Sequence, residues 1–317
     1  MRHLKNNYIL MKKLFLFFYF SINVCLIFGQ KPDTLKTKIL VTDLLKIKQA
    51  GNLQISPDDK SATYIVKSIV QNVDNKLEYD YQTHLWFTDF QSVKQLTQGA
   101  ENVGNYTWAP DNKKIAFLRN KKGKSQIFIM PLDGGEAKQM IEYKYSIGSI
   151  KWSPDGTKIL FTSNVGLNDI LTDSILNPSK TLPSWSFEKP GFNNNSNLQK
   201  NDNIKPNPDG NIGEIRAYLN KNEQDKKAKV INRLNFQGES TTEPEMEFTQ
   251  LLVVEAKENG KIEPLITGFQ SVSNPSWSIS GKGIYYESEL NKNNNPDRER
   301  DEAIYFYDLQ KKTNVMI

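Results

Sequence analysis

The sequence predicts an all-β fold made of tandem four-stranded antiparallel sheets. Three observations support this prediction. A short hairpin motif occurs four times along the chain, each copy is followed by further short apolar runs, and the aromatic share of 11% is rich in Tyr and Phe, which favour strands. The composition of the 317 residues, 38% hydrophobic and 24% charged, is that of an ordinary globular protein.

The repeated motif is a hairpin around a tight turn. In "IKWSPDGTKILFTS", Ile150 and Trp152 precede the turn, and Ile159 and Phe161 follow it. Apolar residues two positions apart place one face of each strand in a core. Proline presets φ at the second turn position, Asp bonds to its own backbone, and Gly accepts a positive φ. The other three copies are "NLQISPDDKSATYIV", "NYTWAPDNKKIAFLR" and "PSWSISGKGIYYES".

Two more strands are expected after each hairpin. The third runs are "HLWFTDF", "QIFIMPL", "QLLVVEA" and "AIYFYDL", and the fourth are "KQLTQG", "AKQMIE", "EPLITG" and "TNVMI". Trp108 and Trp152, at matching places in two copies, are 44 residues apart. A period of about 40–50 residues with four strands per repeat is typical of β-propeller blades. A lone four-stranded sheet cannot cover both of its faces, so consecutive blades are expected to stack on one another.

We therefore expect an incomplete β-propeller of about four blades with one long loop and helix insertion. The expected segments are blades at about 51–98, 104–142, 148–268 and 273–317, together forming a partial propeller over 51–317, and an insertion at about 164–249 within the third blade.

The insertion and the segment before the first blade are expected to contain helices. The first half of the insertion is rich in Asn, Pro and Ser and reads as a loop. Ile212, Ile215 and Leu219 then share one face of a helix, and "KVINRLNFQG" is expected to form an extra strand. Residues 30–50 are expected to hold a short helix capped by Thr42.

The N-terminus has the pattern of an export signal. Lys12 and Lys13 precede an apolar run, Leu14 to Phe28, that is short for a membrane span. We expect residues 1–29 to be a signal peptide and the mature chain to be exported, either periplasmic or secreted, without a stable membrane span. The alternative is an uncleaved N-terminal anchor.

The charge of the chain resides mostly in that signal. The formal net charge is +5, but four of the 41 basic residues and no acidic residue lie in 1–29, which leaves 37 basic against 36 acidic residues. The pI of about 8.9 therefore gives no support to a nucleic-acid partner. Cys25, the only cysteine in the sequence, also lies in this segment, which excludes a disulfide framework or a thiolate metal cluster after cleavage.

The sequence lacks the residues of a serine hydrolase site. A nucleophile elbow requires G-x-S-x-G, and no such string occurs in the sequence. The only histidines are His3, in the expected signal, and His84, at the start of an expected strand. We expect no catalytic residue, no metal site and no cofactor in this chain.

Several of these stretches carry a family resemblance. They are "VTDLLKIKQAGNLQISPDDK", "THLWFTDF…KQLTQG", "WAPDNKKIAFLRNKKGKSQIFIMPLDGGEAKQM" and "KVINRLNFQG…QLLVVEA". In the order of its elements the chain resembles the N-terminal β-propeller portion of the prolyl oligopeptidase family of serine peptidases, above all its acylaminoacyl-peptidase and dipeptidyl-peptidase-like branch. The resemblance implies a seven-bladed propeller that filters peptides above an α/β-hydrolase domain with a Ser-Asp-His triad. The chain departs from it by ending at about the fourth blade, without that hydrolase domain.

The candidates for binding substrate are Glu243, Glu245 and Trp185. Glu243, Glu245 and Glu247 alternate, so an extended strand would place all three on one side. Related dipeptidyl peptidases hold a substrate amine with propeller glutamates, and the resemblance implies this role for Glu243 and Glu245. Trp185, in "PSWSF", would line a substrate path. The alternatives are a solvated loop for the glutamates and a local core for Trp185.

The expected function is that of the substrate-gating propeller of an exported serine peptidase acting on short peptides. Its expected partners are peptides or a hydrolase domain. A homo-oligomer is a further alternative. One alternative is a stand-alone, TolB-like periplasmic propeller that binds other proteins. The other is a truncated peptidase remnant without function, whose open strand edges would favour aggregation.

Overall fold

The computed structural model describes residues 39–185, 203–229, 231, 233–239 and 241–317. The expected signal peptide, 1–29, lies outside these residues. The chain divides into two compact units, Met1–Ile47 and Lys48–Ile317. The first contains a 3-10 helix, η1 (Val41–Lys46), whose N-cap is Leu40. The predicted cap at Thr42 is wrong, because Thr42 lies within the helix. The N-cap is two residues earlier, at Leu40, whose N–H donates to the Asp43 carboxylate at 2.8 Å.

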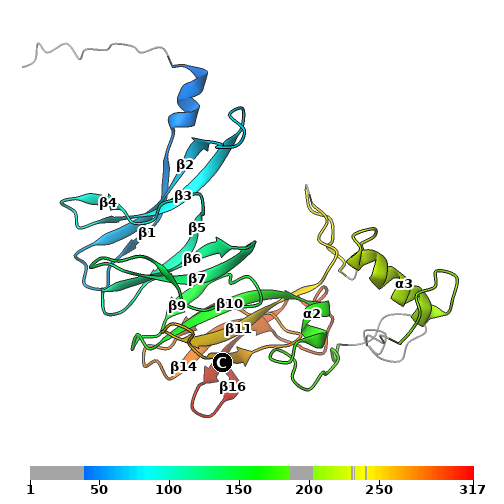
Figure 1. The fold of residues 1–317 in the computed structure, drawn as a ribbon. Coiled ribbons are helices and arrows are strands. Elements are labelled where there is room, and N and C mark those ends of the chain that lie inside the picture. Colours follow the sequence, from blue (N-terminus) through cyan, green and yellow to red (C-terminus); the bar gives the residue numbers. More distant parts are fainter. Residues whose placement is uncertain (1–38, 186–202, 230, 232, 240) are drawn as a thin grey trace, which may run out of the picture. The chain divides into compact units, whose positions relative to one another are not determined.

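Four antiparallel sheets of four strands form the second unit, which confirms the predicted fold class (Figure 1). We call them blades 1 to 4. Blade 1 contains β1 (Gln49–Ile55), β2 (Ala62–Gln71), β3 (Tyr79–Thr88) and β4 (Val93–Gln95). Blade 2 contains β5 (Val103–Trp108), β6 (Lys114–Lys121), β7 (Lys124–Pro131) and β8 (Lys138–Gln139). Blade 3 contains β9 (Ile150–Trp152), β10 (Lys158–Gly166), β11 (Glu247–Glu255) and β12 (Ile262–Ile266). Blade 4 contains β13 (Ser273–Trp277), β14 (Gly283–Glu289), β15 (Glu302–Asp308) and β16 (Thr313–Met316).

The turn between the first two strands has the same geometry in every blade. In blade 3 the Ser153 N–H donates to the Lys158 carbonyl at 2.9 Å, and Gly156 has a φ of 71°. Blades 1 and 2 fill this left-handed position with Asp59 and Asn112, at 58° and 60°, and blade 4 uses Gly281 at 69°. Asn and Asp tolerate this backbone region better than other non-glycine residues, which explains why the motif survives without its glycine.

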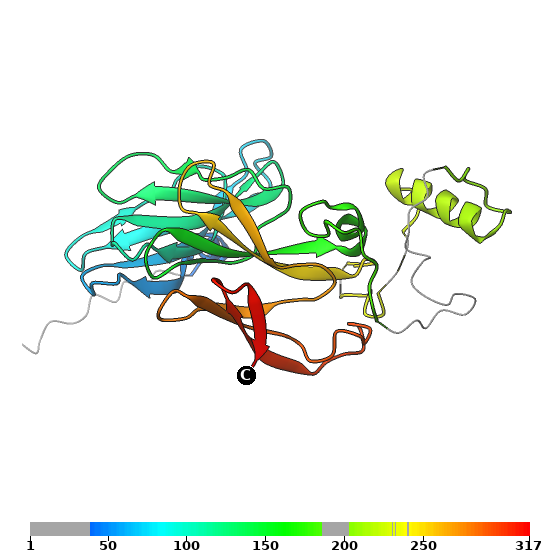
Figure 2. The ribbon, with the colours of Figure 1, turned by 90° about the horizontal axis from the view of Figure 1, so that it is seen from below.

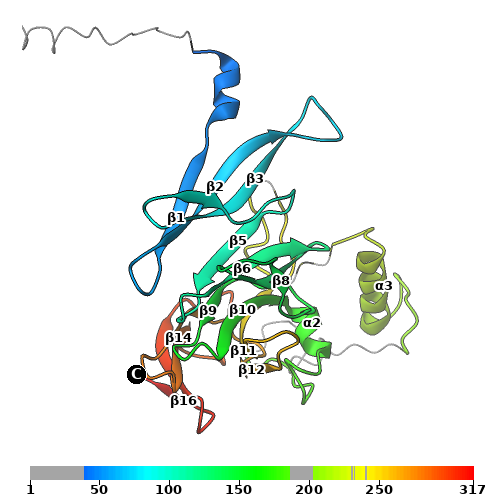
Figure 3. The same ribbon diagram turned by 60° about the vertical axis from the view of Figure 1, so that its left-hand side comes forward.

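Blades 2 and 3 have two apolar faces, because their middle strands bury residues on both sides. We call the face toward the preceding blade the incoming face and the face toward the next blade the outgoing face. Outgoing Leu85 and incoming Phe117 share one cluster between blades 1 and 2, and Leu251 and Tyr286 share one between blades 3 and 4. Figure 2 shows blade 4, in orange and red, against blade 3, and Figure 3 shows β5 and β6 of blade 2 beside β9 of blade 3.

A tryptophan at the end of the first strand ties each later blade to the one before it. All three indole N–H groups donate to a first- or second-strand residue of the preceding blade. Trp108 donates to the Thr63 hydroxyl at 2.8 Å, Trp152 to the Thr107 carbonyl at 3.3 Å, and Trp277 to the Lys151 carbonyl at 3.1 Å. The matching places that the repeat predicts for these tryptophans are therefore also matching places in space.

Replacing Trp108 with Phe is expected to destabilise the protein, because Thr63 is fully buried and would lose the donor to its hydroxyl. An unsatisfied buried polar group costs about 1–3 kcal/mol. Urea unfolding of Trp108→Phe, Thr63→Val and the double variant measures this loss. The double variant is expected to lose less than the two single losses together. Strict additivity would show that the two side chains do not interact.

The insertion leaves blade 3 between β10 and β11. It contains α2 (Leu167–Thr172) and the predicted amphipathic helix, α3 (Ile212–Gln224). Asn211 caps α3 by accepting the Gly213 and Glu214 N–H groups, and Glu214 bonds back to the Asn211 N–H at 2.8 Å, which forms a capping box. None of the residues of α3 is buried.

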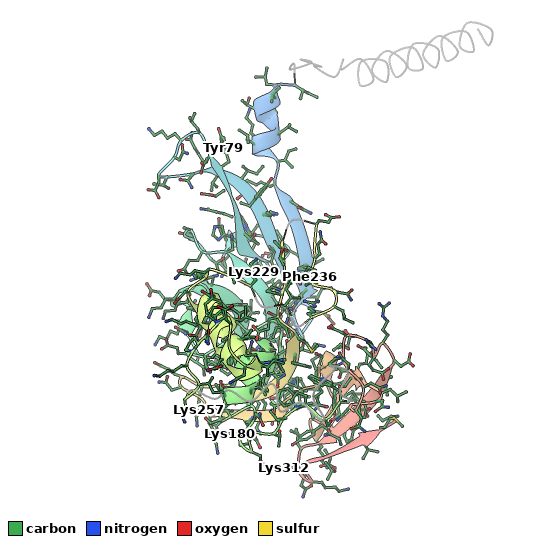
Figure 4. The ribbon with its side chains drawn as sticks, turned by 90° about the vertical axis from the view of Figure 1, so that its right-hand side faces the viewer. Tyr79, Lys180, Lys229, Phe236, Lys257 and Lys312 are labelled. Atoms are coloured by element: carbon green, nitrogen blue, oxygen red, sulfur yellow. The ribbon has the colours of Figure 1, made fainter. Side chains whose placement is uncertain are left out.

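The extra strand predicted over "KVINRLNFQG" is wrong. The described residues of this segment, which Lys229 and Phe236 mark in Figure 4, join no sheet, and only an isolated bridge links Gln237 to Thr242. The chain folds back on itself here, with the Glu243 N–H donating to the Phe236 carbonyl at 2.7 Å. These local bonds satisfy backbone groups that a strand would have offered to a sheet edge.

Among the described residues, no helix is both long and apolar enough to cross a membrane. Within the same residues, no three His, Cys, Asp or Glu side chains are grouped so that they could hold a metal ion.

Candidate functional site

The predicted binding residues lie where the insertion joins blade 3, and we call this region the insertion root. It consists of the end of β10, α2 and the segment that returns to β11. The Leu167 N–H donates to the Met246 carbonyl at 2.8 Å, and the Glu245 carboxylate accepts the Asn168 N–H at 2.8 Å. A Cβ at Gly166 would lie 2.7 Å from the Glu245 carboxyl carbon, so any larger residue there would displace this carboxylate from its place at α2.

Glu245 is therefore held by the start of α2, and its environment disfavours its charge. Burial is the largest cause that raises the pKa of Glu245, and the charges of Asp169 and Glu223 raise it further. The hydrogen bond from the Asn168 N–H acts in the opposite direction. A glutamate of this kind can hold a proton above the usual range of pH.

Two substitutions of Glu245 are expected to separate its hydrogen bond from its charge. Glu245→Ala removes the acceptor for the Asn168 N–H and should cost about 1 kcal/mol of unfolding free energy. Glu245→Gln keeps an acceptor oxygen and should cost less at pH 7.

The pH dependence gives the second readout. Because the folded pKa of Glu245 is raised, its stabilisation is present below the unfolded value and is lost as pH rises through the folded value. Urea unfolding at several pH values should show wild type gaining stability relative to Glu245→Gln as the pH falls toward 4.5, the ordinary glutamate value. A constant difference between the two proteins would contradict the raised pKa.

The alternation of the glutamates predicted that Glu243 and Glu245 would share one side of a strand, and the structure shows that they do not. Only Glu247 belongs to β11, and the other two precede it in the returning loop. The exposed Glu243 carboxylate pairs with the Arg233 guanidinium at 3.0 Å. Local hydrogen bonds turn this loop away from an extended course, so the two glutamates face different partners. Their assignment to substrate binding stays a prediction.

Trp185 is buried at the insertion root rather than open to solvent. Its ring stacks on Phe248 at a centroid distance of 6.0 Å and meets Phe269 edge-on at 6.1 Å. It belongs to the same apolar cluster as Met246 and Ile170. The core alternative for Trp185 fits this placement, and a direct contact with substrate would require its 7% exposed fraction to increase.

An aspartate that the sequence analysis did not single out organises the same region. Asp173 is buried and accepts hydrogen bonds from the Tyr145 hydroxyl at 2.8 Å and the Lys144 ammonium at 3.2 Å. Its other oxygen accepts the Ile175 and Leu176 N–H groups. Burial alone would raise the pKa of Asp173, but these donors together lower it, so the carboxylate is ionised. It fastens the insertion to the loop after β8.

A polar residue near the start of the third strand is a second feature that the sequence analysis missed. The Gln126 side chain bonds to the Tyr143 N–H and carbonyl, and the Gln250 side chain to the Gly268 N–H and carbonyl. Each glutamine thereby joins its third strand to the loop that leaves its blade. Its repeated place, directly before the runs "IFI" and "LLV", was the signal that could have revealed this role.

His84 has the same place in blade 1. Its Nδ1 lies 3.5 Å from the Thr97 hydroxyl, in the loop after β4. Burial, and then the charge of Arg119, lower the pKa of His84, which keeps the ring neutral. This neutral, buried ring fits the strand role that the glutamines have in the next two blades.

A cavity of about 360 Å³ lies at the turns of blades 3 and 4. Its lining includes Asp155, Lys158, Lys282 and Asp308. Both carboxylates already accept hydrogen bonds within their own turns, from Ser153 and Thr157 and from Gln310 and Lys311. These bonds lower the pKa of Asp155 and of Asp308, so neither carboxyl is suited to act as a general acid near neutral pH.

Comparison with known proteins shows the fold. No family model and no curated protein matches the chain. An acylaminoacyl peptidase in complex with Z-Gly-Gly-Phe-chloromethyl ketone superimposes with a TM-score of 0.51 at 14% identity, covering 87% of this chain and 33% of that one. An acylaminoacyl peptidase of Pyrococcus horikoshii has a TM-score of 0.49 at 13% identity, covering 86% of this chain and 33% of that one. TolB from Acinetobacter baumannii has a TM-score of 0.41 at 13% identity, covering 85% of this chain and 43% of that one.

The four sheets, together with the first of these superpositions, define the fold. The chain is a β-propeller built of four-stranded antiparallel blades, like the region of the acylaminoacyl peptidase on which it superimposes. It spans about a third of the length of the two acylaminoacyl peptidases.

Proposed function

We propose that the chain is the substrate-gating propeller of an exported serine peptidase that acts on short peptides. The observation that carries the proposal is the superposition on an acylaminoacyl peptidase over 87% of this chain, together with the order of motifs in the sequence. The catalytic serine, aspartate and histidine belong, in this proposal, to a hydrolase domain outside these 317 residues. The propeller selects peptides by size.

Two features of the insertion root support a role in peptide selection. The root holds the Glu245 carboxylate against the start of α2, and in the same returning segment the exposed Glu243 carboxylate pairs with Arg233. Carboxylates of this kind attract the ammonium group of a peptide N-terminus. The groups that would break the peptide bond lie elsewhere in the proposal, because the sequence contains neither G-x-S-x-G nor a second histidine outside the signal.

A hydrolysis assay tests where the catalysis lies. The purified chain is incubated with chromogenic dipeptide and acyl-peptide substrates, and release of the chromophore is compared with a buffer blank. The expected rate equals the blank. Turnover that persists through purification and that a serine-directed inhibitor stops would contradict the proposal.

The coding DNA after Ile317 tests the peptidase assignment separately. A G-x-S-x-G motif followed by Asp and His in the same frame is the expected result. A stop codon followed by unrelated sequence would favour a stand-alone TolB-like propeller that binds other proteins. The same motif after a frameshift would favour a truncated remnant.

A further inference from the structure

The cavity at the turns of blades 3 and 4 lies at the opposite end of blade 3 from the insertion root. β10 begins at the cavity with Lys158 and ends at the root with Gly166, so roughly 26 Å of strand separates the two regions. The cavity's volume of about 360 Å³ is at the lower end of the range for small-molecule sites, about 300–1,000 Å³. It is therefore a second region of the chain that is large enough to hold a small ligand.

An asparagine closes the corresponding gap between the turns of blades 1 and 2. The Asn112 side-chain oxygen accepts the Asp58 N–H at 3.1 Å and so links the two turns. Asn112 has the left-handed position of its turn, and Gly281 has that position in blade 4. Gly281 has no side chain that could reach the turn of blade 3. The gap between blades 3 and 4 is left open for this reason.

Two lysines face this gap, one from each blade. Lys158 follows the turn of blade 3, and Lys282 lies in the turn of blade 4. Each of the other two junctions has one lysine at these two places. The residues there are Lys114 with Thr157 between blades 2 and 3, and Ser61 with Lys113 between blades 1 and 2. The pair of lysines thus distinguishes the junction of blades 3 and 4 from the other two.

The ammonium groups of the lining are free, whereas its carboxylates are not. Asp155 and Asp308 accept hydrogen bonds within their own turns, and Asp308 also lies 3.9 Å from the Lys311 ammonium. Within the described parts of the chain, the side chains of Lys158 and Lys282 form no hydrogen bond and no ion pair. Two free ammonium groups favour an anionic ligand, because each can donate charge-assisted hydrogen bonds to its oxygens.

Trp277 gives the cavity an apolar wall. Its side chain is half-buried, whereas Trp108 and Trp152, at the same place in blades 2 and 3, are buried. Leu309 also lines the cavity. The ligand that fits this lining carries an apolar group beside its anionic group.

We propose that this cavity binds the C-terminal carboxylate of a short peptide. Lys158 and Lys282 hold the carboxylate, and Trp277 contacts the apolar side chain of the last residue. The inference goes beyond the proposed function and does not depend on peptide hydrolysis, because the cavity is formed entirely by blades 3 and 4.

Isothermal titration calorimetry tests the proposal with N-acetyl-Ala-Phe as the probe. The peptide acid is expected to bind with a Kd below about 1 mM, and its C-terminal amide at least about tenfold more weakly. Lys158→Met and Lys282→Met should each weaken binding of the acid at least about tenfold. The matched controls are Lys114→Met and Lys113→Met, at the same places in the other junctions, which should leave binding unchanged.

Gly281→Asn tests the site without removing a charge. An asparagine keeps the left-handed backbone there, as Asn112 does with a φ of 60°, and a Cβ at Gly281 would lie 3.6 Å from Pro154. The variant should fold, as circular dichroism verifies, and should lose peptide binding because its side chain fills the gap.

Three results would overturn the proposal. The first is an acid that binds no better than its amide, or no binding of either. The second is wild-type affinity in Gly281→Asn, which would place the ligand elsewhere. The third is inorganic phosphate binding as tightly as the peptide acid, which would show a general anion site in which the apolar wall has no role.

Discussion

Phe117→Ala is expected to lower the unfolding free energy by roughly 3–5 kcal/mol, the usual loss for a buried Phe replaced by Ala. Phe117 is 0% exposed on the incoming face of blade 2 and stacks on Phe128 at a centroid distance of 5.9 Å. The Arg119 guanidinium lies over the same ring at 5.2 Å. Truncation would leave a cavity between two sheets that cannot close without moving a whole blade.

Tyr64→Ala is the matched control for that experiment. Tyr64 has the same position in blade 1, but within the described part of the chain no blade covers it and it is half-buried. Its truncation should cost about 1 kcal/mol, as for a residue that leaves no closed cavity. The free energies come from urea unfolding followed by circular dichroism. Equal losses at both positions would show that the blades do not bury their incoming faces as the structure describes.

Trp185→Ala is expected to have an effect of similar size, also roughly 3–5 kcal/mol. The indole contacts both Phe248 and Phe269, which also contact each other, and the exposed fraction of Phe248 is 0%. Removing it would open the apolar cluster that anchors the insertion to blade 3. Trp185→Phe keeps an aromatic ring in the stack and should cost less than half as much.

The same two variants separate a core role for Trp185 from a role in lining a substrate path. A residue that only lines a path can be truncated with little change in stability, within about 0.5 kcal/mol. Unfolding free energies are measured beside the affinity for a short peptide with a free amine. Unchanged stability in Trp185→Ala together with lost peptide binding would contradict the core role.

The blades could be predicted because their signals are local. Alternation of apolar residues, the turn residues and the 44-residue spacing of Trp108 and Trp152 all lie within one repeat. Each residue that faces a neighbouring blade has a counterpart at the same place in the next repeat, so one correct hairpin predicted the others. The tryptophans confirm this logic, since all three donate to the blade before them.

The insertion root could not be predicted in the same way, because its contacts join distant parts of the chain. The bond between Glu245 and the Asn168 N–H spans 77 residues, and that between Tyr145 and Asp173 spans 28. The alternation of Glu243, Glu245 and Glu247 suggested a strand that local bonds, such as Glu243 N–H to Phe236, replace with a turn. The insertion contains no sequence repeat, so a prediction for one of its segments could not be checked against an equivalent segment elsewhere in the chain.

Residues 48–317 form consecutive antiparallel sheets that stack face to face, with one tryptophan at each junction. A crystal structure of the purified protein measures this most directly. The indole nitrogens of Trp108, Trp152 and Trp277 are expected within hydrogen-bond distance of Thr63, Thr107 and Lys151, each on the sheet before its own. Indoles that point away from the preceding sheets, or that lie on elements unrelated to one another, would contradict the account.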